Sequence, residues 1–211
     1  MVGLMTAAQR ERSALVDTFR EVGPHAATLC EGWNTTDLAA HLVVRERRLD
    51  ATAGIALPFL AGYTARVQGN VARSTSWDAL VDLVAAGPPI YSPFKLLDPV
   101  ANLGEMFIHH EDVRRAVDGW QPRALDASTA GQLRRQLGLM SRIMLSKLPA
   151  QVVLQTTTGE RIARVGRGEA VTITGEPQEL LLFVAGRDAV RLEFDGDPQS
   201  VAAVKAAPRG L

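Results

Sequence analysis

The feature that most constrains this fold is a change in hydrophobic spacing near Pro149. Before Pro149, apolar residues recur at intervals of three and four in segments separated by glycine and proline, the pattern of amphipathic helices. After it, short runs rich in valine, leucine and isoleucine alternate with turn-forming residues, which is typical of strands. The sequence therefore predicts a mainly α protein with a helical domain at residues 1–149 and a small α+β domain at 150–211.

The helical domain is predicted from separate periodic segments. They cover residues 4–22, a segment that starts near residue 35, a segment from about 77 that ends before Gly87, a segment from Asp98 to Gly119, and residues 128–148. Asp98-Pro99 is a strong helix start, because aspartate caps a helix and proline is tolerated at its first position. Residues 51–75 have a mixed pattern, and the aromatic, proline-rich loop 87–98 is expected to border a site. Four of these segments are strong or moderate helix predictions, and together they predict an up-and-down four-helix bundle.

The C-terminal segment has the composition of a small mixed domain. Two strands flank a predicted turn at Thr158-Gly159. The elements expected after them are a strand at 170–174, a helix at 176–184, a strand at 189–194 and a helix at 198–206. This order predicts an α+β unit of roughly 60 residues, near the lower size at which a domain folds alone.

Composition excludes several classes of protein. Lysine and arginine number 23 and aspartate and glutamate number 23, so no net field attracts nucleic acid or an anionic membrane. No segment has the apolar length of a membrane span or signal peptide. The single cysteine, Cys30, excludes an internal disulfide and is interpreted as an inert buried thiol. We expect a cytoplasmic monomer or homodimer whose partners are small molecules.

Three residues on two predicted helices could bind a divalent metal. Glu105 and His109 lie one turn apart on one helix, and His41 lies beside the apolar stripe of an earlier helix. Two imidazoles and one carboxylate suit zinc, with nickel or iron(II) as alternatives, and three protein ligands leave a position open for chemistry. On spacing alone, histidines at such positions are more often hydrogen-bonded core or boundary residues, and the spacing leaves open whether His109 or His110 faces inward.

Two motifs carry a resemblance to a known family. The segments GWNTTDLAAHLVVRE and NLGEMFIHHEDVRRA resemble the mycothiol-dependent maleylpyruvate isomerase family of actinobacteria, which belongs to the DinB-like metal-binding bundles. The resemblance covers roughly residues 5–150 and implies that His41, Glu105 and His109 bind the metal. It thus favours His109 over His110, which becomes a packed neighbour. The segments TGEPQELLLFVAGR and AVRLEFDGD resemble a sterol-carrier-like α/β domain.

The resemblance also implies a function. It indicates a metal-dependent transferase or isomerase that activates a low-molecular-weight thiol, mycothiol, toward an electrophilic substrate. The alternatives are a non-catalytic metal-binding protein and a carrier of a small molecule or lipid. No catalytic residue beyond the metal ligands is predicted.

Four further residues are candidates for supporting this site. Arg45 and Arg48 follow His41 by one and two turns and are candidates to bind the thiol cofactor, although the run 45–48 is more typical of a solvated helix face. Asp37 and Asp112 are spaced to orient the ligating imidazoles. Asp37 is equally well explained as a first-turn acid favoured by the helix dipole.

Overall fold

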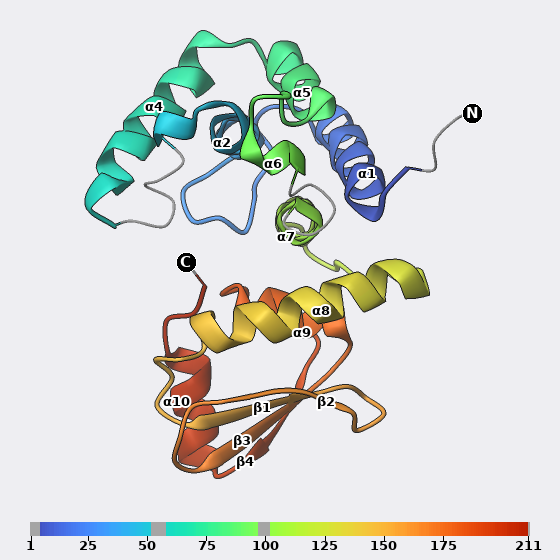
Figure 1. The fold of residues 1–211 in the computed structure, drawn as a ribbon, viewed down its shortest axis with the longest axis vertical. Helices are drawn as coiled ribbons and strands as arrows, with labels where there is room; N and C mark the ends of the chain where they lie inside the picture. Colours follow the sequence, from blue (N-terminus) through green and yellow to red (C-terminus); the bar gives the residue numbers. More distant parts are fainter. Residues whose placement is uncertain (1–4, 52–57, 97–101, 211) are drawn as a thin grey trace. The chain divides into compact units, whose positions relative to one another are not determined.

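A computed structural model of the protein describes residues 5–51, 58–96 and 102–210 of the 211. The chain divides into two compact units, Met1–Gln121 and Pro122–Leu211 (Figure 1). Within the described ranges the first unit is helical, and the second combines helices with a four-stranded sheet. The mainly α protein with a small α+β unit predicted from the sequence is therefore confirmed at this level.

The first unit is an assembly of helices, drawn in blue to green in Figure 1. Its elements are α1 (Ala7–Val22), α2 (Thr35–Arg47), the short 3₁₀ helix η1 (Pro58–Leu60), α4 (Ala61–Ser74), α5 (Trp77–Ala86), α6 (Pro93–Leu96) and α7 (Leu103–Arg114). Helix α1 packs against α7 and α5, and α2 packs against α4 and α5. These contacts place α2 and α7, which carry the candidate metal ligands, in one packed unit.

Local sequence sets the ends of these helices. Asn34 caps α2 by accepting a hydrogen bond from the amide of Asp37, whose carboxylate accepts one from the amide of Asn34 at 3.1 Å. Gly23 ends α1 and Gly87 ends α5, with φ of 78° and 68°, values that side-chain-bearing residues rarely adopt. Capping residues and glycines therefore determine where these helices begin and end.

One apolar core holds the helices of the first unit together. Its largest buried members are Leu15, Phe19, Leu38, Leu42, Leu80 and Met106. They come from α1, α2, α5 and α7, and burying one such side chain contributes roughly 1.5–3 kcal/mol. The candidate ligands are therefore carried by helices whose relative position is fixed by packing.

The second unit packs helices against a mixed sheet. Its elements are α8 (Ala127–Met144), β1 (Gln151–Gln155), β2 (Arg161–Val165), β3 (Ala170–Thr174), α9 (Pro177–Val184), β4 (Glu193–Gly196) and α10 (Pro198–Ala206). The strand order is β2-β1-β3-β4, with β1 parallel to β3 and the other two pairings antiparallel. Helix α8 contacts α9 and β2, and Figure 1 shows α8 and α9 side by side.

The structure divides the chain earlier than the sequence predicted. The helix expected at 128–148 as part of the bundle is α8, and it belongs to the second unit, so the division falls after Gln121 and not after Pro149. The mixed segment 51–75 instead contains α4, which packs on α2. The apolar stripe of α8 correctly indicated an amphipathic helix, but such a stripe does not specify its partner. A DinB-like bundle and a sterol-carrier-like domain stay predictions.

Some predicted boundaries and core positions also differ. Helix α7 ends at Arg114, five residues before the expected Gly119, and the predicted start at Asp98-Pro99 lies outside the described residues. The apolar spacing of the sequence also predicts that Val117 faces inward, but this residue follows the end of the helix and is 61% exposed. Leu49, which the same spacing places on the apolar stripe of the earlier helix, lies beyond the end of α2 at Arg47 and is 44% exposed. The periodic pattern continued past the points where the helices stop.

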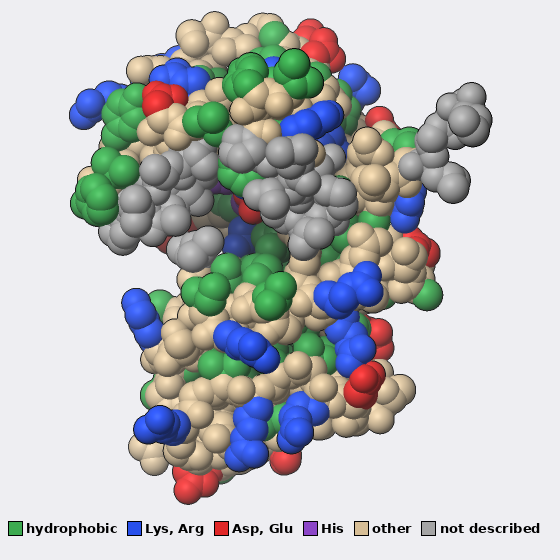
Figure 2. All heavy atoms as spheres, viewed as in Figure 1, with side chains coloured by type: hydrophobic (Ala, Val, Ile, Leu, Met, Phe, Trp, Pro, Cys, Tyr) green, Lys and Arg blue, Asp and Glu red, His purple; other side chains and the backbone are tan. Residues whose placement is uncertain are grey.

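The described surface carries side chains of both charges (Figure 2). On the face drawn in Figure 2, lysine and arginine side chains are scattered, with aspartate and glutamate side chains among them. Among the helices described here, none combines the length and apolar character needed to cross a bilayer.

The revised boundary makes a testable prediction about folding. Leu133 and Leu137 of α8 are fully buried, so a fragment of residues 122–211 should unfold cooperatively in urea, whereas a fragment of residues 150–211 should not. Circular dichroism during a urea titration measures both. If both fragments unfolded with equal cooperativity, the result would support a domain boundary at Pro149.

Candidate metal centre

Three side chains of the first unit converge on one carboxylate oxygen. Oε1 of Glu105 lies 3.5 Å from Nε2 of His41 and 3.4 Å from Nε2 of His109. The three ligand atoms all lie within 4.8 Å of one another. His41 comes from α2, whereas Glu105 and His109 lie one turn apart on α7. The structure thus brings together the three residues that the sequence singled out.

Hydrogen bonds orient both imidazoles toward that oxygen. Nδ1 of His41 lies 3.3 Å from Oε1 of Gln68, and Nδ1 of His109 lies 2.9 Å from Oδ2 of Asp112. Because both partners are acceptors, each Nδ1 carries a proton, and a ring without a second proton presents its lone pair on Nε2. Two lone pairs and a carboxylate directed at one point form a donor set that suits a divalent ion such as zinc.

Burial and hydrogen bonding compete over the charges here. Burial alone would raise the pKa of Glu105, but hydrogen bonds from His109 and His41 and the charge of Arg45 lower it well below its ordinary value. Burial likewise opposes charge on His109, yet hydrogen bonds to Asp112, Cys30 and Glu105 raise its pKa well above the ordinary value. In the metal-free protein Glu105 is therefore an anion and His109 a cation.

Arg45 belongs to this site and not to a solvated face. Its side chain is buried, and Nε lies 3.1 Å from Oε1 of Glu105. Nη1 donates to Oδ1 of Asn102 at 2.8 Å, and the guanidinium stacks 4.3 Å from the centre of the Phe94 ring. Phe94 comes from the proline-rich loop that was expected to border a site. Arg45 thus fixes the position of Glu105.

Arg48 and Asp37 have different surroundings. Arg48 is nearly half exposed and forms an ion pair with Asp50 at 2.8 Å, so its assignment to thiol binding stays a prediction. Asp37 accepts from the amide of Asn34 as part of the α2 cap, and Gln68 is the residue that orients His41. For Asp37, the structure supports the alternative explanation, a first-turn acid.

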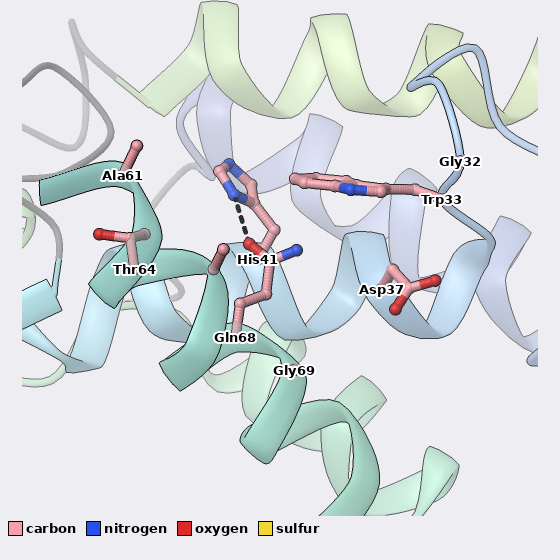
Figure 3. Close-up of a pocket in the computed structure, with 9 residues that line it drawn as sticks. Gly32, Trp33, Asp37, His41, Ala61, Thr64, Gln68 and Gly69 are labelled. Atoms are coloured by element: carbon pink, nitrogen blue, oxygen red, sulfur yellow. Dashed lines mark hydrogen bonds between the residues drawn. The ribbon is translucent and has the colours of Figure 1, made fainter. Parts of the chain in front are cut away.

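A pocket of about 460 Å³ opens beside His41 (Figure 3). The Trp33 ring, centred 5.2 Å from the His41 ring, lines it together with Thr64 and Gln68 of α4. Small residues complete its wall: Gly32, Ala61, Ala65 and Gly69. Space for a small molecule therefore adjoins one of the three candidate ligands.

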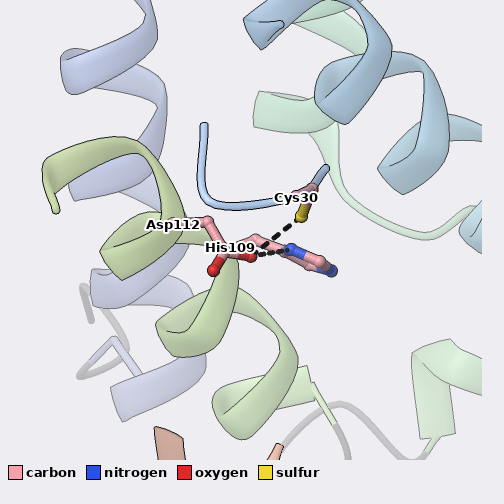
Figure 4. Close-up of side chains that lie close together, drawn as sticks. All are labelled: Cys30, His109 and Asp112. Atoms are coloured by element: carbon pink, nitrogen blue, oxygen red, sulfur yellow. Dashed lines mark hydrogen bonds and ion pairs between the residues drawn. The ribbon is translucent and has the colours of Figure 1, made fainter. Parts of the chain in front are cut away.

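Cys30 is close to the site and is not the fully buried, isolated thiol that the sequence predicted. It is partly exposed, and its thiol donates to Oδ2 of Asp112 at 3.2 Å (Figure 4). The same carboxylate oxygen accepts from Nδ1 of His109. The sequence offered no partner for this thiol because 79 positions separate it from His109, and only the fold joins them.

His110 faces away from Glu105 and toward α1. Its Nδ1 lies 2.7 Å from Oε1 of Glu11, and its Nε2 lies 2.9 Å from Oγ1 of Thr18. Successive helical residues point about 100° apart, so neighbouring histidines serve different surfaces of α7. This placement agrees with the preference for His109 as the ligand.

Sequence reasoning missed two of the residues that support the site. Gln68 lies in the segment whose pattern was mixed, and Asn102 precedes α7 by one position. A recognised helix at 61–74 would have placed Gln68 on the same face as Thr64, one turn away. Asn102 had no comparable signal, because its role depends on Arg45 from another helix.

Comparison with known proteins supports the fold. Neither the patterns of known families nor the curated protein sequences gave a match. Among solved structures, the chain is similar to the crystal structure of a histidine-to-alanine mutant of mycothiol-dependent maleylpyruvate isomerase, with a TM-score of 0.62 and 15% sequence identity. The match covers 90% of each chain. At this identity the likeness shows a shared fold, which agrees with the resemblance carried by the two sequence motifs.

The geometry predicts an asymmetric response to substitution. His41→Ala, Glu105→Ala and His109→Ala should each weaken zinc retention by at least about 100-fold, because each removes one of three donors. His110→Ala should keep zinc but lower the free energy of unfolding by about 1–3 kcal/mol through lost hydrogen bonds. Competition with a chromophoric chelator measures retention, and the exposed His25→Ala is the matched control. If His110→Ala lost zinc while the other three variants kept it, the assignment of this site would be wrong.

The raised pKa of His109 predicts how metal affinity varies with pH. Binding at Nε2 requires the neutral ring, so affinity should fall about tenfold per pH unit below the pKa of His109, which is well above its ordinary value. Glu105, with its lowered pKa, stays ionised over this range. Asp112→Asn should move the fall to lower pH, because an amide no longer favours the imidazolium. If the affinity for zinc did not change between about pH 6 and about pH 9, this result would contradict the assignment.

Proposed function

We propose that this protein binds one divalent metal through His41, Glu105 and His109 and uses it in thiol-dependent transferase or isomerase chemistry. The observation that carries the proposal is the convergence of both Nε2 atoms on Oε1 of Glu105. Zinc suits this set, and nickel and iron(II) are compatible with it. Three protein donors leave room for an exogenous ligand, as in catalytic sites.

The thiol is proposed from the fold. The structural neighbour is a mycothiol-dependent isomerase, and two motifs of this chain resemble its family. When bound, a divalent ion would supply Lewis acidity that lowers the pKa of a thiol held against it. Mycothiol is therefore proposed as the cosubstrate and an electrophilic small molecule as the substrate.

Other residues of the chain would orient the metal ligands and line the pocket beside them. Asp112 and Gln68 hold the two imidazoles in the tautomer that presents Nε2. Arg45 holds Glu105 at 3.1 Å and offsets part of its charge, so that the carboxylate keeps one orientation. The flat Trp33 ring and the polar Thr64 and Gln68 line the adjoining pocket, where a small ligand would be held next to His41.

The proposal predicts turnover that requires both metal and thiol. Protein loaded with zinc should convert maleylpyruvate, or a general electrophile such as chlorodinitrobenzene, faster with mycothiol than without it. His41→Ala should lower kcat/KM by at least about 100-fold, because it removes a donor that faces the pocket, whereas His25→Ala should not change it. Absorbance assays follow both reactions.

Two outcomes would overturn the enzymatic part of the proposal. Zinc binding without any thiol-dependent turnover would favour the non-catalytic metal-binding alternative. Turnover that is equal in wild type and His41→Ala would place the chemistry elsewhere in the chain.

A further inference from the structure

A second group of donors lies on the other side of the His109 ring. Sγ of Cys30 is 3.2 Å from Oδ2 of Asp112, which is 2.9 Å from Nδ1 of His109. The three donor atoms lie within 4.8 Å of one another. Figure 4 shows that Cys30 comes from the loop beside α7, while the other two residues lie on that helix. This group differs from the first in containing a thiol and in using Nδ1.

The loop that carries Cys30 is fixed against α7. The amide of Leu29 donates to the carbonyl oxygen of Asp112 at 2.9 Å, and the amide of Cys30 donates to Oγ1 of Thr28 at 3.2 Å. The Thr28 hydroxyl in turn donates to the carbonyl oxygen of Trp33 at 2.9 Å. The thiol is therefore positioned before any ligand arrives.

The spacing and charge of this group suit a soft cation. Metal bonds of about 2.0–2.3 Å place tetrahedral ligand atoms roughly 3–4 Å apart, close to the observed separations. A thiolate and the fully buried Asp112 carboxylate together balance the charge of a divalent ion. The carboxylate of the first group, Glu105, already pairs with Arg45. Thiolate donors favour soft d¹⁰ ions over magnesium or calcium.

We propose that Cys30, His109 and Asp112 form a second cation site, selective for ions softer than zinc, such as cadmium(II) or copper(I). The cation replaces the protons on Sγ and Nδ1, which leave to solvent. Nε2 of His109 keeps its proton in the metal-free protein, or takes one from solvent when a metal leaves it, and donates it to Glu105. A neutral imidazole has one lone pair. Occupation of this site therefore excludes His109 from the site formed with His41 and Glu105, and soft ions displace the metal held there.

Cadmium titration of the full-length protein tests this proposal. Wild type should develop the ultraviolet charge-transfer band of a cadmium–thiolate bond, and Cys30→Ser should abolish it while lowering cadmium affinity at least about tenfold. His41→Ala should keep the band, because His41 belongs only to the other site. Cys30 is the single cysteine, so in wild type cadmium should also slow its alkylation by iodoacetamide, whereas magnesium should not.

Each opposite result overturns the proposal. A wild-type protein without the band, or with unprotected Cys30, has no thiolate site. A band lost in His41→Ala would show that Cys30 joins a single centre with His41 and that no second site exists. The two proposals are tested separately. His41→Ala should lose zinc retention and keep the cadmium band. If the proposed function fails, the cadmium band is unchanged. Serine can keep the hydrogen bond to Asp112, and circular dichroism verifies that the variant folds.

Discussion

The candidate centre depends on one partly buried carboxylate. Oε1 of Glu105 is shared by two imidazoles and the Arg45 guanidinium, all within 3.5 Å. A negative charge largely withdrawn from water is tolerated only with such partners, and each partner must then keep its position. The apolar core that joins α1, α2, α5 and α7 supplies that constraint, because it fixes the helix bearing His41 against the helix bearing His109.

On the side of each imidazole that faces away from Glu105, a hydrogen-bond acceptor determines which ring nitrogen faces the carboxylate. Gln68 and Asp112 hold the Nδ1 protons of His41 and His109, so both Nε2 atoms face Glu105. Asp112 also accepts from Cys30, so His109 lies between two sets of donors and has one nitrogen for each. A single side chain can thus couple the proposed thiol chemistry to the identity of the bound metal.

Features set within a few residues could be predicted from the sequence, whereas contacts between distant segments could not. The start of α2 near residue 35 and the one-turn spacing of Glu105 and His109 could be predicted, because both are set within a few residues. The partner of α8 could not, since an amphipathic stripe identifies a buried face and not the surface that covers it. For the same reason Gln68 was missed and Cys30 was interpreted as a residue outside the site: each reaches the site only through packing between segments. The resemblance, in contrast, correctly anticipated the shared fold.

The most direct test of the central claim is an anomalous difference map at the zinc edge, from crystals grown with zinc. The account predicts one peak about 2.0–2.2 Å from Nε2 of His41, Nε2 of His109 and a carboxylate oxygen of Glu105. A peak beside His110, or none near these three residues, would contradict it.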